Sequence, residues 1–154
     1  MAASSELALS SATLPTALGQ ASKRMRTVVV DDSETFLKVI CHLLDLENLI
    51  DLVAAACDGV EAIDTVIRLK PALVVMDVCM PGLDGLSAAS LLAEMSPAPA
   101  VILMSSDDSP QLRAACERAG AFAFVHKENF RQEFEAVLER VAQARDAQWV
   151  RETA

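Results

Sequence analysis

The stretch LVVMDVCMPGLDG, residues 73–85, decides the expected fold. Four apolar residues lead into Asp77, and a Pro-Gly pair shortly afterwards favours a loop. A continuous apolar run bounded by turn residues is typical of a strand that is buried on both faces of a parallel sheet. Asp77 is therefore expected at the carboxyl end of that strand, the edge of an open α/β sheet where ligands bind. An aspartate before a turn can also simply accept hydrogen bonds from its own backbone, so Asp77 alone leaves both interpretations open.

The composition indicates one domain with an aliphatic core. The chain has 154 residues, enough to bury a core without disulfides or metals. Because 53% of the residues are hydrophobic and only 4% aromatic, an α/β fold is favoured over an all-β sandwich. The formal net charge of -9 opposes the counterion release that drives nucleic-acid binding, so DNA is not expected as a direct partner.

The cysteines and the hydropathy pattern favour a cytoplasmic protein. Cys41, Cys57, Cys79 and Cys116 occur singly, so neither a zinc site nor a disulfide framework is indicated. No run approaches the roughly 18 apolar residues of a membrane helix. The first residues also lack the basic and then compactly apolar pattern of a secretory signal.

Apolar runs alternate with helical patterns from Thr27 onward. The other strands are expected at 28–30, 52–56, 100–104 and 121–125. The last helix should open with a capping box of Asn129 and Gln132. Residues expected on the inward faces of the helices are Phe36, Val39, Ile40, Leu43, Leu44, Val60, Ile63, Ile67, Ala88, Leu91, Leu92, Met95, Leu112, Ala115, Cys116, Ala119, Phe130, Phe134, Val137, Leu138 and Val141. Five strands alternating with five helices predict a doubly wound, flavodoxin-like parallel sheet with helices on both faces.

Three segments are expected along the chain. Residues 1–24 are dominated by Ala, Ser, Thr and Leu without a sustained period, which predicts a flexible extension. Residues 25–145 form the domain, and 146–154 a C-terminal tail in which Trp149 is expected to contact a partner or a second copy of the chain. Because only nine residues follow Arg145, no helix-turn-helix module fits, and the chain is expected to stand alone or to act through partners.

The strand ends bring five polar residues to one edge of the sheet: Asp31, Asp32, Asp77, Ser105 and Lys127. Carboxylates about 4 Å apart repel each other by ~4 kcal/mol per pair at an effective dielectric constant near ~20, so the three aspartates call for a cation. Carboxylate oxygens with room for water suit Mg²⁺. A metal, a lysine and a hydroxyl around one carboxylate are the groups needed to move a phosphoryl group onto it.

Each polar residue also has a purely structural interpretation. An Asp-Asp pair before a helix usually caps it, and a lone lysine is usually a solvated surface charge. Ser105 could be an ordinary strand-end hydroxyl. Five residues with unrelated structural roles are not expected to meet at the same edge of the sheet. Their joint placement there favours a functional site. His42 and His126 stand alone, without a metal partner at ligand spacing, and are expected to be structural.

Four motifs in order carry a family resemblance: VVVDDSE (28–34), VVMDVCMPGLDG (74–85), VILMSS (101–106) and GAFAFVHK (120–127). Together they resemble the receiver domain of two-component response regulators. The resemblance covers roughly residues 25–145, and together with the nine residues that follow it predicts a stand-alone, single-domain response regulator.

The resemblance implies specific roles for the polar edge. Asp77 matches the phosphoacceptor, and Ser105 and Lys127 match the hydroxyl and the lysine that act with it. Asp31 and Asp32 match the acidic pair that, together with Asp77, holds Mg²⁺.

Three further positions follow from the same resemblance. The backbone carbonyl of Cys79 matches the fourth metal ligand from the protein. Phe124 matches the aromatic residue that rotates when the Ser105 hydroxyl is drawn to the phosphate. Glu128 stands where the family usually has a proline after the lysine, so the loop after the last strand is expected to depart from the family pattern.

The resemblance also implies partners. The phosphoryl donor would be a sensor histidine kinase or a histidine phosphotransfer protein. A downstream protein would bind the face formed by the helix that starts at Ser109, the last strand and the last helix. Beyond its own Mg²⁺-dependent phosphorylation and dephosphorylation, the domain is not expected to be an enzyme.

Three alternatives remain. A hydrolase of the haloacid-dehalogenase type also uses a strand-end aspartate, but it normally has a second aspartate two residues later, where this chain has Cys79. A flavodoxin-like cofactor binder would need a phosphate loop after the first strand, where residues 31–34 are acidic and would repel phosphate. The third alternative is a receiver fragment of a DNA-binding regulator.

Overall fold

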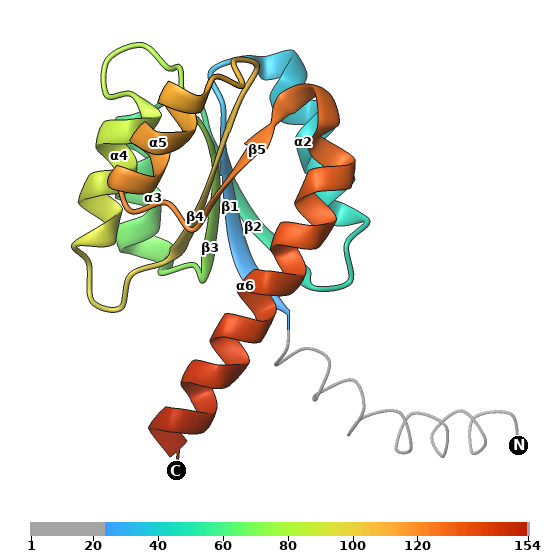
Figure 1. The fold of residues 1–154 in the computed structure, drawn as a ribbon, viewed down its shortest axis with the longest axis vertical. Helices are drawn as coiled ribbons and strands as arrows, with labels where there is room; N and C mark the ends of the chain where they lie inside the picture. Colours follow the sequence, from blue (N-terminus) through green and yellow to red (C-terminus); the bar gives the residue numbers. More distant parts are fainter. Residues whose placement is uncertain (1–23, 154) are drawn as a thin grey trace, which may run out of the picture.

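A computed structural model describes residues 24–153 as a five-stranded parallel sheet (Figure 1). The strands are β1 (Met25–Val30), β2 (Ile50–Ala56), β3 (Leu73–Asp77), β4 (Ala100–Ser105) and β5 (Ala123–His126). Their order is β2-β1-β3-β4-β5, so β3 lies in the centre and every residue of β3 is buried. The predicted doubly wound α/β fold is confirmed.

Five helices cover the two faces of the sheet (Figure 1). They are α2 (Glu34–Asp45), α3 (Gly59–Leu69), α4 (Gly85–Ala93), α5 (Pro110–Arg118) and α6 (Phe130–Thr153), and a short 3-10 helix, η1 (Lys127–Asn129), precedes α6. The helices α2 and α6 pack on one face of the sheet, and α3, α4 and α5 on the other. Both faces of the central strands are therefore shielded from water, which explains their continuous apolar sequences.

Side-chain caps fix where four helices begin. Ser33, Asp58, Asp84 and Ser109 each accept a hydrogen bond from the backbone N–H three residues later, at 2.8–3.3 Å. Pro110 occupies the first position of α5, as expected. These caps lie in the loops that follow β1, β2, β3 and β4, so they position the loops at the carboxyl edge of the sheet.

The predicted capping box of Asn129 and Gln132 is wrong. Asn129 ends η1, and α6 begins at Phe130. The carboxylate of Glu133 instead accepts a hydrogen bond of 2.8 Å from the backbone N–H of His126. The last strand and the last helix are thus joined by Glu133, one residue beyond the predicted partner.

Four residues predicted to face inward are exposed. The exposed fractions are 50% for Val39, 68% for Val60, 58% for Ile67 and 49% for Leu91. Ala88 is buried, as predicted, and four further small or compact residues of α3 and α4 share the buried face: Ala62, Thr65, Val66 and Ala89. Small side chains let the helix backbone approach the sheet closely, which moves the larger residues to the border of the contact.

The helix α6 continues beyond the domain that the sequence predicts. Its Phe134, Val137, Leu138 and Val141 are buried, as predicted. Residues 146–153 are its last turns, and they extend past the sheet with Trp149 exposed (Figure 1). Of the predicted N-terminal extension, residues 1–23 lie outside the described residues. Within residues 24–153, no helix is both long and apolar enough to cross a membrane.

Candidate functional site

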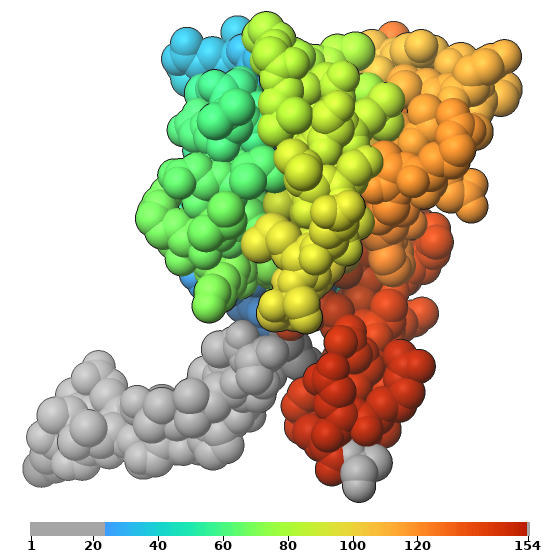
Figure 2. Space-filling view, turned by 90° about the vertical axis from the view of Figure 1, so that its left-hand side faces the viewer, coloured from blue at the N-terminus to red at the C-terminus, as the bar shows by residue number. Residues whose placement is uncertain are grey.

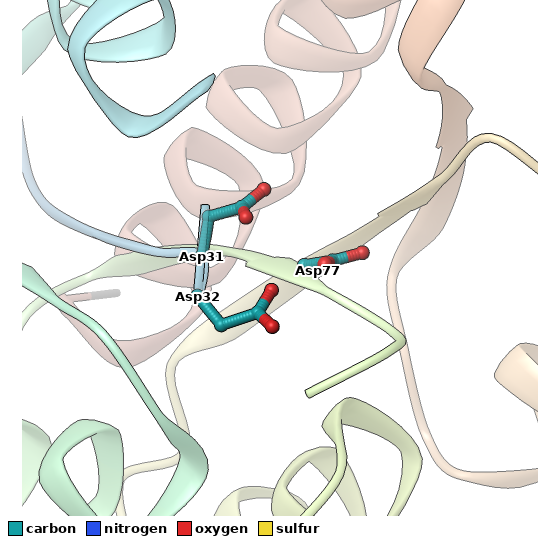
Figure 3. A group of neighbouring side chains, drawn as sticks. All are labelled: Asp31, Asp32 and Asp77. Carbon is teal, nitrogen blue, oxygen red and sulfur yellow. The ribbon is translucent and has the colours of Figure 1, made fainter. Parts of the chain in front are cut away.

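Three carboxylates meet at the carboxyl edge of the sheet. Asp31 and Asp32 directly follow β1, and Asp77 is the last residue of the neighbouring strand β3. Oxygen atoms of the three side chains lie within 4.8 Å of one another, and Figure 3 shows them on the same side of the strand ends. Asp31 and Asp77 are buried whereas Asp32 is exposed, so two of the charges are removed from water and one faces it.

Lys127 is the cation of this cluster. Its Nζ lies 2.7 Å from Oδ2 of Asp31 and 3.3 Å from Oδ2 of Asp77. The ammonium group also lies 4.2 Å from the centroid of the Phe36 ring, at a distance typical of a cation–π contact. Phe36 was predicted only as an inward-facing residue of α2. Phe36 lies one helical turn after Ser33, so the predicted start of this helix already indicates a position near the acidic pair. The contact of Phe36 with Lys127 could not be predicted from the sequence.

The donor set fits a divalent cation. Asp31, Asp32 and Asp77 carry three negative charges, and among residues 24–153 only Lys127 forms an ion pair with any of them. Oxygen ligands with one solvent-facing member suit Mg²⁺, which keeps several waters. The remaining negative charge and the all-oxygen chemistry therefore match this ion.

The carboxyl group of Asp77 is strongly affected by its surroundings. Burial raises its pKa above the ordinary value, and the neighbouring Asp31 carboxylate raises it further. The ammonium of Lys127 and the backbone N–H of Cys79, which lies 3.4 Å from Oδ1, act in the opposite direction. Burial dominates, so the charged form of Asp77 is disfavoured and would be favoured by a bound cation.

Ser105 and Phe124 lie on the β4–β5 side of the site. Ser105 ends β4 and is buried, and its Oγ accepts a hydrogen bond of 3.0 Å from the backbone N–H of Asp107. Phe124 is partly buried in β5, and the guanidinium of Arg113 lies 4.6 Å from the centre of its ring. Arg113 also pairs with Asp108, which ties α5 to the loop after β4. Sequence reasoning missed Arg113, because nothing in the helical pattern of α5 relates it to β5.

The structure also locates four other residues considered in the sequence: Cys79, Glu128, His126 and His42. Cys79 is exposed in the loop after β3, and its backbone N–H rather than its thiol contacts Asp77. Glu128 lies in η1 and is exposed. His126 Nε2 lies 2.9 Å from the carbonyl oxygen of Ser106, and His42 is exposed in the last turn of α2. Neither histidine belongs to the carboxylate cluster.

The loop between β3 and α4 is held tightly against Asp77. A Cβ atom at Gly85 would lie 2.2 Å from the carbonyl oxygen of Asp77, and the N–H of Gly85 donates to the carbonyl of Val78 at 2.8 Å. On the other side of the loop, a Cβ atom at Gly59 would lie 2.2 Å from the carbonyl oxygen of Leu83. Glycine is therefore required at both positions, because the backbones of α3, α4 and the loop touch directly.

Comparison with known proteins agrees with this geometry. Residues 27–139 match the family model of the response regulator receiver domain, and the chain belongs to this family. The family match sets aside the haloacid-dehalogenase and flavodoxin-like alternatives.

Similar proteins include several longer ones. The chain is 38% identical over 104 residues to protein-glutamate methylesterase/protein-glutamine glutaminase 5 of Myxococcus xanthus, an alignment that covers 67% of this chain and 30% of that protein. It is 32% identical over 127 residues to the corresponding protein of Thermotoga maritima, covering 78% and 37% of the two chains. The chain thus spans about a third of the length of these relatives.

Solved structures show the same fold. The response regulator domain of CheB from Thermotoga maritima superimposes with a TM-score of 0.69 at 32% sequence identity, over 79% of this chain and 96% of that one. The signal receiver domain of the response regulator NarL from Mycobacterium tuberculosis gives a TM-score of 0.72 at 29% identity, over 77% and 97%.

Proposed function

We propose that this protein receives a phosphoryl group on Asp77 from a phosphohistidine, carried by a sensor histidine kinase or a histidine phosphotransfer protein. The observation that carries the proposal is the position of the Asp77 carboxylate. It lies at the end of the central strand, 3.3 Å from the Lys127 ammonium and beside two further carboxylates. A nucleophilic oxygen, a fixed cation and a cation-binding cluster thus share one edge.

Different residues of the site have different roles in the phosphoryl transfer. An oxygen of Asp77 forms the new bond to phosphorus while the phosphorus–nitrogen bond of the donor histidine breaks, and the electron pair of that bond returns to the imidazole. The Lys127 ammonium lies close enough to Asp77 to stabilise charge on the phosphoryl oxygens. The Ser105 hydroxyl, at the end of the adjacent strand, is a donor for one of these oxygens.

Asp31, Asp32 and Asp77, together with the backbone carbonyl of Cys79, would hold Mg²⁺. When bound, the ion neutralises the carboxylates and the oxygens of the transferred group. Asp31 and Lys127 then act as the fixed frame, since both are largely buried and hydrogen-bonded to each other at 2.7 Å.

The output of the domain is a change in partner binding on the face of α5, β5 and α6. Ser105 leads into the loop before α5, and Phe124 lies in β5 under Arg113 of α5. Movement of the Ser105 hydroxyl toward a phosphoryl group would release its hydrogen bond with the N–H of Asp107 and change the loop that holds Arg113. The methylesterase and glutaminase activities in the names of the longer relatives are not part of this proposal.

Incubation with acetyl phosphate and Mg²⁺, followed by intact-mass and peptide mass spectrometry, tests the proposal. We expect one phosphoryl group, mapped to Asp77. Asp77→Asn should remain unmodified because an amide is a far poorer nucleophile, whereas Asp107→Asn, an exposed aspartate at the same edge, should be modified like the wild type. Incorporation at another residue, or full incorporation in Asp77→Asn, would refute the assignment of the phosphoacceptor.

A further inference from the structure

A concave surface lies at the edge of the sheet opposite to Asp77, where the strands begin. It is a cavity of about 940 Å³ between the C-terminal half of α6 and the segments that lead into β1, β3 and β4. Figure 1 shows this half of α6 extending past the sheet next to the start of β1, and Figure 2 shows it (red) beside the segment between α4 and β4 (yellow). We call this cavity the basal groove. It is separated from Asp77 by the length of the strands.

The basal groove carries a local excess of positive charge. Four cations line it, Arg24, Arg26, Lys70 and Arg145, against the single carboxylate of Glu152. This excess contrasts with the formal charge of -9 of the whole chain. Within residues 24–153, no ion pair involves any of the four cations. None of the four is therefore paired directly with a carboxylate in the described part of the protein.

Two of the cations are held in place by neutral groups. Arg24 donates from Nε and Nη2 to the carbonyl oxygen of Ile50, at 3.2 and 2.7 Å. Arg26 donates from Nη1 to the carbonyl oxygen of Leu69 at 2.6 Å. A carbonyl orients a guanidinium without cancelling its charge, and each guanidinium has five N–H donors. Both arginines therefore keep donors for a carboxylate, with less side-chain entropy to lose on binding.

Apolar side chains stand beside these cations. Trp149 lines the groove from α6 and Ile67 from α3, and their exposed fractions are 65% and 58%. Large exposed apolar residues next to fixed cations are typical of surfaces that bind protein partners, in which aromatic and arginine side chains provide most of the binding energy.

We propose that the basal groove binds an acidic segment of a partner protein, whose carboxylates pair with the arginines while an apolar side chain packs on Trp149. Charge complementarity favours this occupant over two others. A symmetric dimer through the groove would place the cations of one copy against those of the other. Residues 1–23 contain only one acidic residue, Glu6, and also carry Lys23, so this segment is not complementary to the groove.

Trp149 provides a direct readout because it is the only tryptophan of the chain. The probe is a short tryptophan-free peptide with leucines at helical spacing and glutamates at the other positions, titrated into the full chain. We expect a saturable shift of Trp149 emission that weakens as salt is added, because the pairs are partly exposed. Matched peptides with lysine or glutamine in place of glutamate should bind much more weakly. Equal binding of either matched peptide, or no saturable shift with the glutamate peptide, would overturn the proposal.

Substitutions in the groove test the role of its charges in peptide binding without disturbing the fold. The double variant Lys70→Gln with Arg145→Gln removes two cations that make no hydrogen bond or ion pair within the described residues, so folding should be unaffected. Its affinity for the glutamate peptide should fall roughly fivefold, as for two exposed charge pairs. Arg131→Gln, on the same helix but outside the groove, is the control and should bind like the wild type. An unchanged affinity of the double variant would contradict the role of the cations.

The other two occupants give different results. A second copy would make Trp149 emission depend on the concentration of the protein alone, with dimers in sedimentation equilibrium. A synthetic peptide of residues 1–23 that displaced the glutamate peptide would identify the chain's own segment as the ligand. Either result would overturn the assignment to an acidic partner. Asp77→Asn should bind the glutamate peptide like the wild type, so the test is independent of phosphorylation.

Discussion

The ammonium group of Lys127 and the carboxylate of Asp31 form an ion pair of 2.7 Å between residues that are 96 positions apart in the chain. The pair joins the end of β5 to the end of β1 across the two strands that lie between them. The side chain of Lys127 is 13% exposed and that of Asp31 is fully buried, so the charge of Asp31 depends on this partner for its compensation.

Lys127→Met should therefore destabilise the protein strongly when no divalent cation is present. Loss of one partner from a buried ion pair costs about 3–5 kcal/mol, because the other charge remains buried and unpaired. The control is Lys38→Met, which breaks an ion pair with Glu34 on the surface of α2 and should cost less than about 1 kcal/mol. Urea unfolding measures both free energies. Adding Mg²⁺ should restore part of the loss in Lys127→Met alone, and equal losses in the two variants would argue against a buried pair.

Asp77→Asn should raise the melting temperature at neutral pH in the absence of Mg²⁺. Burial raises the pKa of Asp77 above its ordinary value of 3.8, so the folded state binds this proton more tightly than the unfolded state does. The contribution of this group to stability therefore falls as the pH rises from 3.8 through the raised pKa, and at neutral pH its charge is destabilising. Thermal melts of both proteins across this pH range should show that the difference between their melting temperatures becomes smaller as the pH is lowered. A wild type that is more stable than the variant at pH 7 would contradict the expected destabilising effect of the Asp77 charge.

Asp32→Ala should weaken Mg²⁺ binding with little effect on folding. Asp32 is exposed, so its removal leaves no buried group unpaired, but the cluster loses one of its three carboxylates. We expect the dissociation constant for Mg²⁺ to rise at least about tenfold, since even groups that only support metal ligands contribute ~10- to 100-fold. Calorimetric titration measures it. Asp64→Ala, an exposed aspartate of α3 outside the cluster, should titrate like the wild type.

Ser105→Ala should still accept phosphate at Asp77 but should transmit the change poorly to Phe124. The variant lacks the hydroxyl that would follow the phosphoryl oxygen, so phosphorylation would no longer favour the active arrangement. Fluorine NMR of protein labelled with fluorophenylalanine follows the Phe124 ring with and without acetyl phosphate. The signal should shift in the wild type and in the control Ser106→Ala, and it should remain near its starting position in Ser105→Ala. A full shift of the signal in Ser105→Ala would show that Phe124 responds independently of the Ser105 hydroxyl.

A chain ending at Arg145 should remain nearly as stable as the full chain. Beyond Arg145, Trp149 and Val150 are exposed, so their removal gives up little buried area. Ending the chain before Phe134 should instead unfold it, because four buried side chains of ~1.5–3 kcal/mol each are lost from a total stability of ~5–15 kcal/mol. Melting curves of the three chains test this. A large loss of stability in the chain ending at Arg145 would show that Trp149 contributes to the folded core.

The polar edge could be predicted from the sequence because strand ends in a parallel sheet have a fixed geometry. Once the apolar runs before Asp31, Asp77 and Ser105 are assigned as parallel strands, their last residues must meet at one edge. The sequence pattern could not show that Lys127 pairs with Asp31 more closely than with Asp77, at 2.7 against 3.3 Å. That difference depends on side-chain conformations and on Phe36, which packs against the ammonium group.

The exposed faces of the helices were harder to predict. Periodicity identifies an apolar stripe but not which of its residues lies at the centre of the contact, so Val60 and Ile67 were placed inward while Ala62 and Val66 make the contact. The extent of α6 beyond Arg145 was also missed, because its last turns contact no core and leave no apolar period in the sequence.

The glycine at position 85 closes one side of the proposed phosphoacceptor site. Because no Cβ atom fits between Gly85 and the carbonyl oxygen of Asp77, the start of α4 cannot move any closer to the end of β3. On the opposite side, Ser106, Asp107 and Asp108 in the loop after β4 are exposed, and hydrogen bonds and one ion pair hold them there. We therefore expect a phosphoryl group on Asp77 to displace the loop after β4 more readily than the start of α4. This asymmetry would direct the response of the domain toward α5.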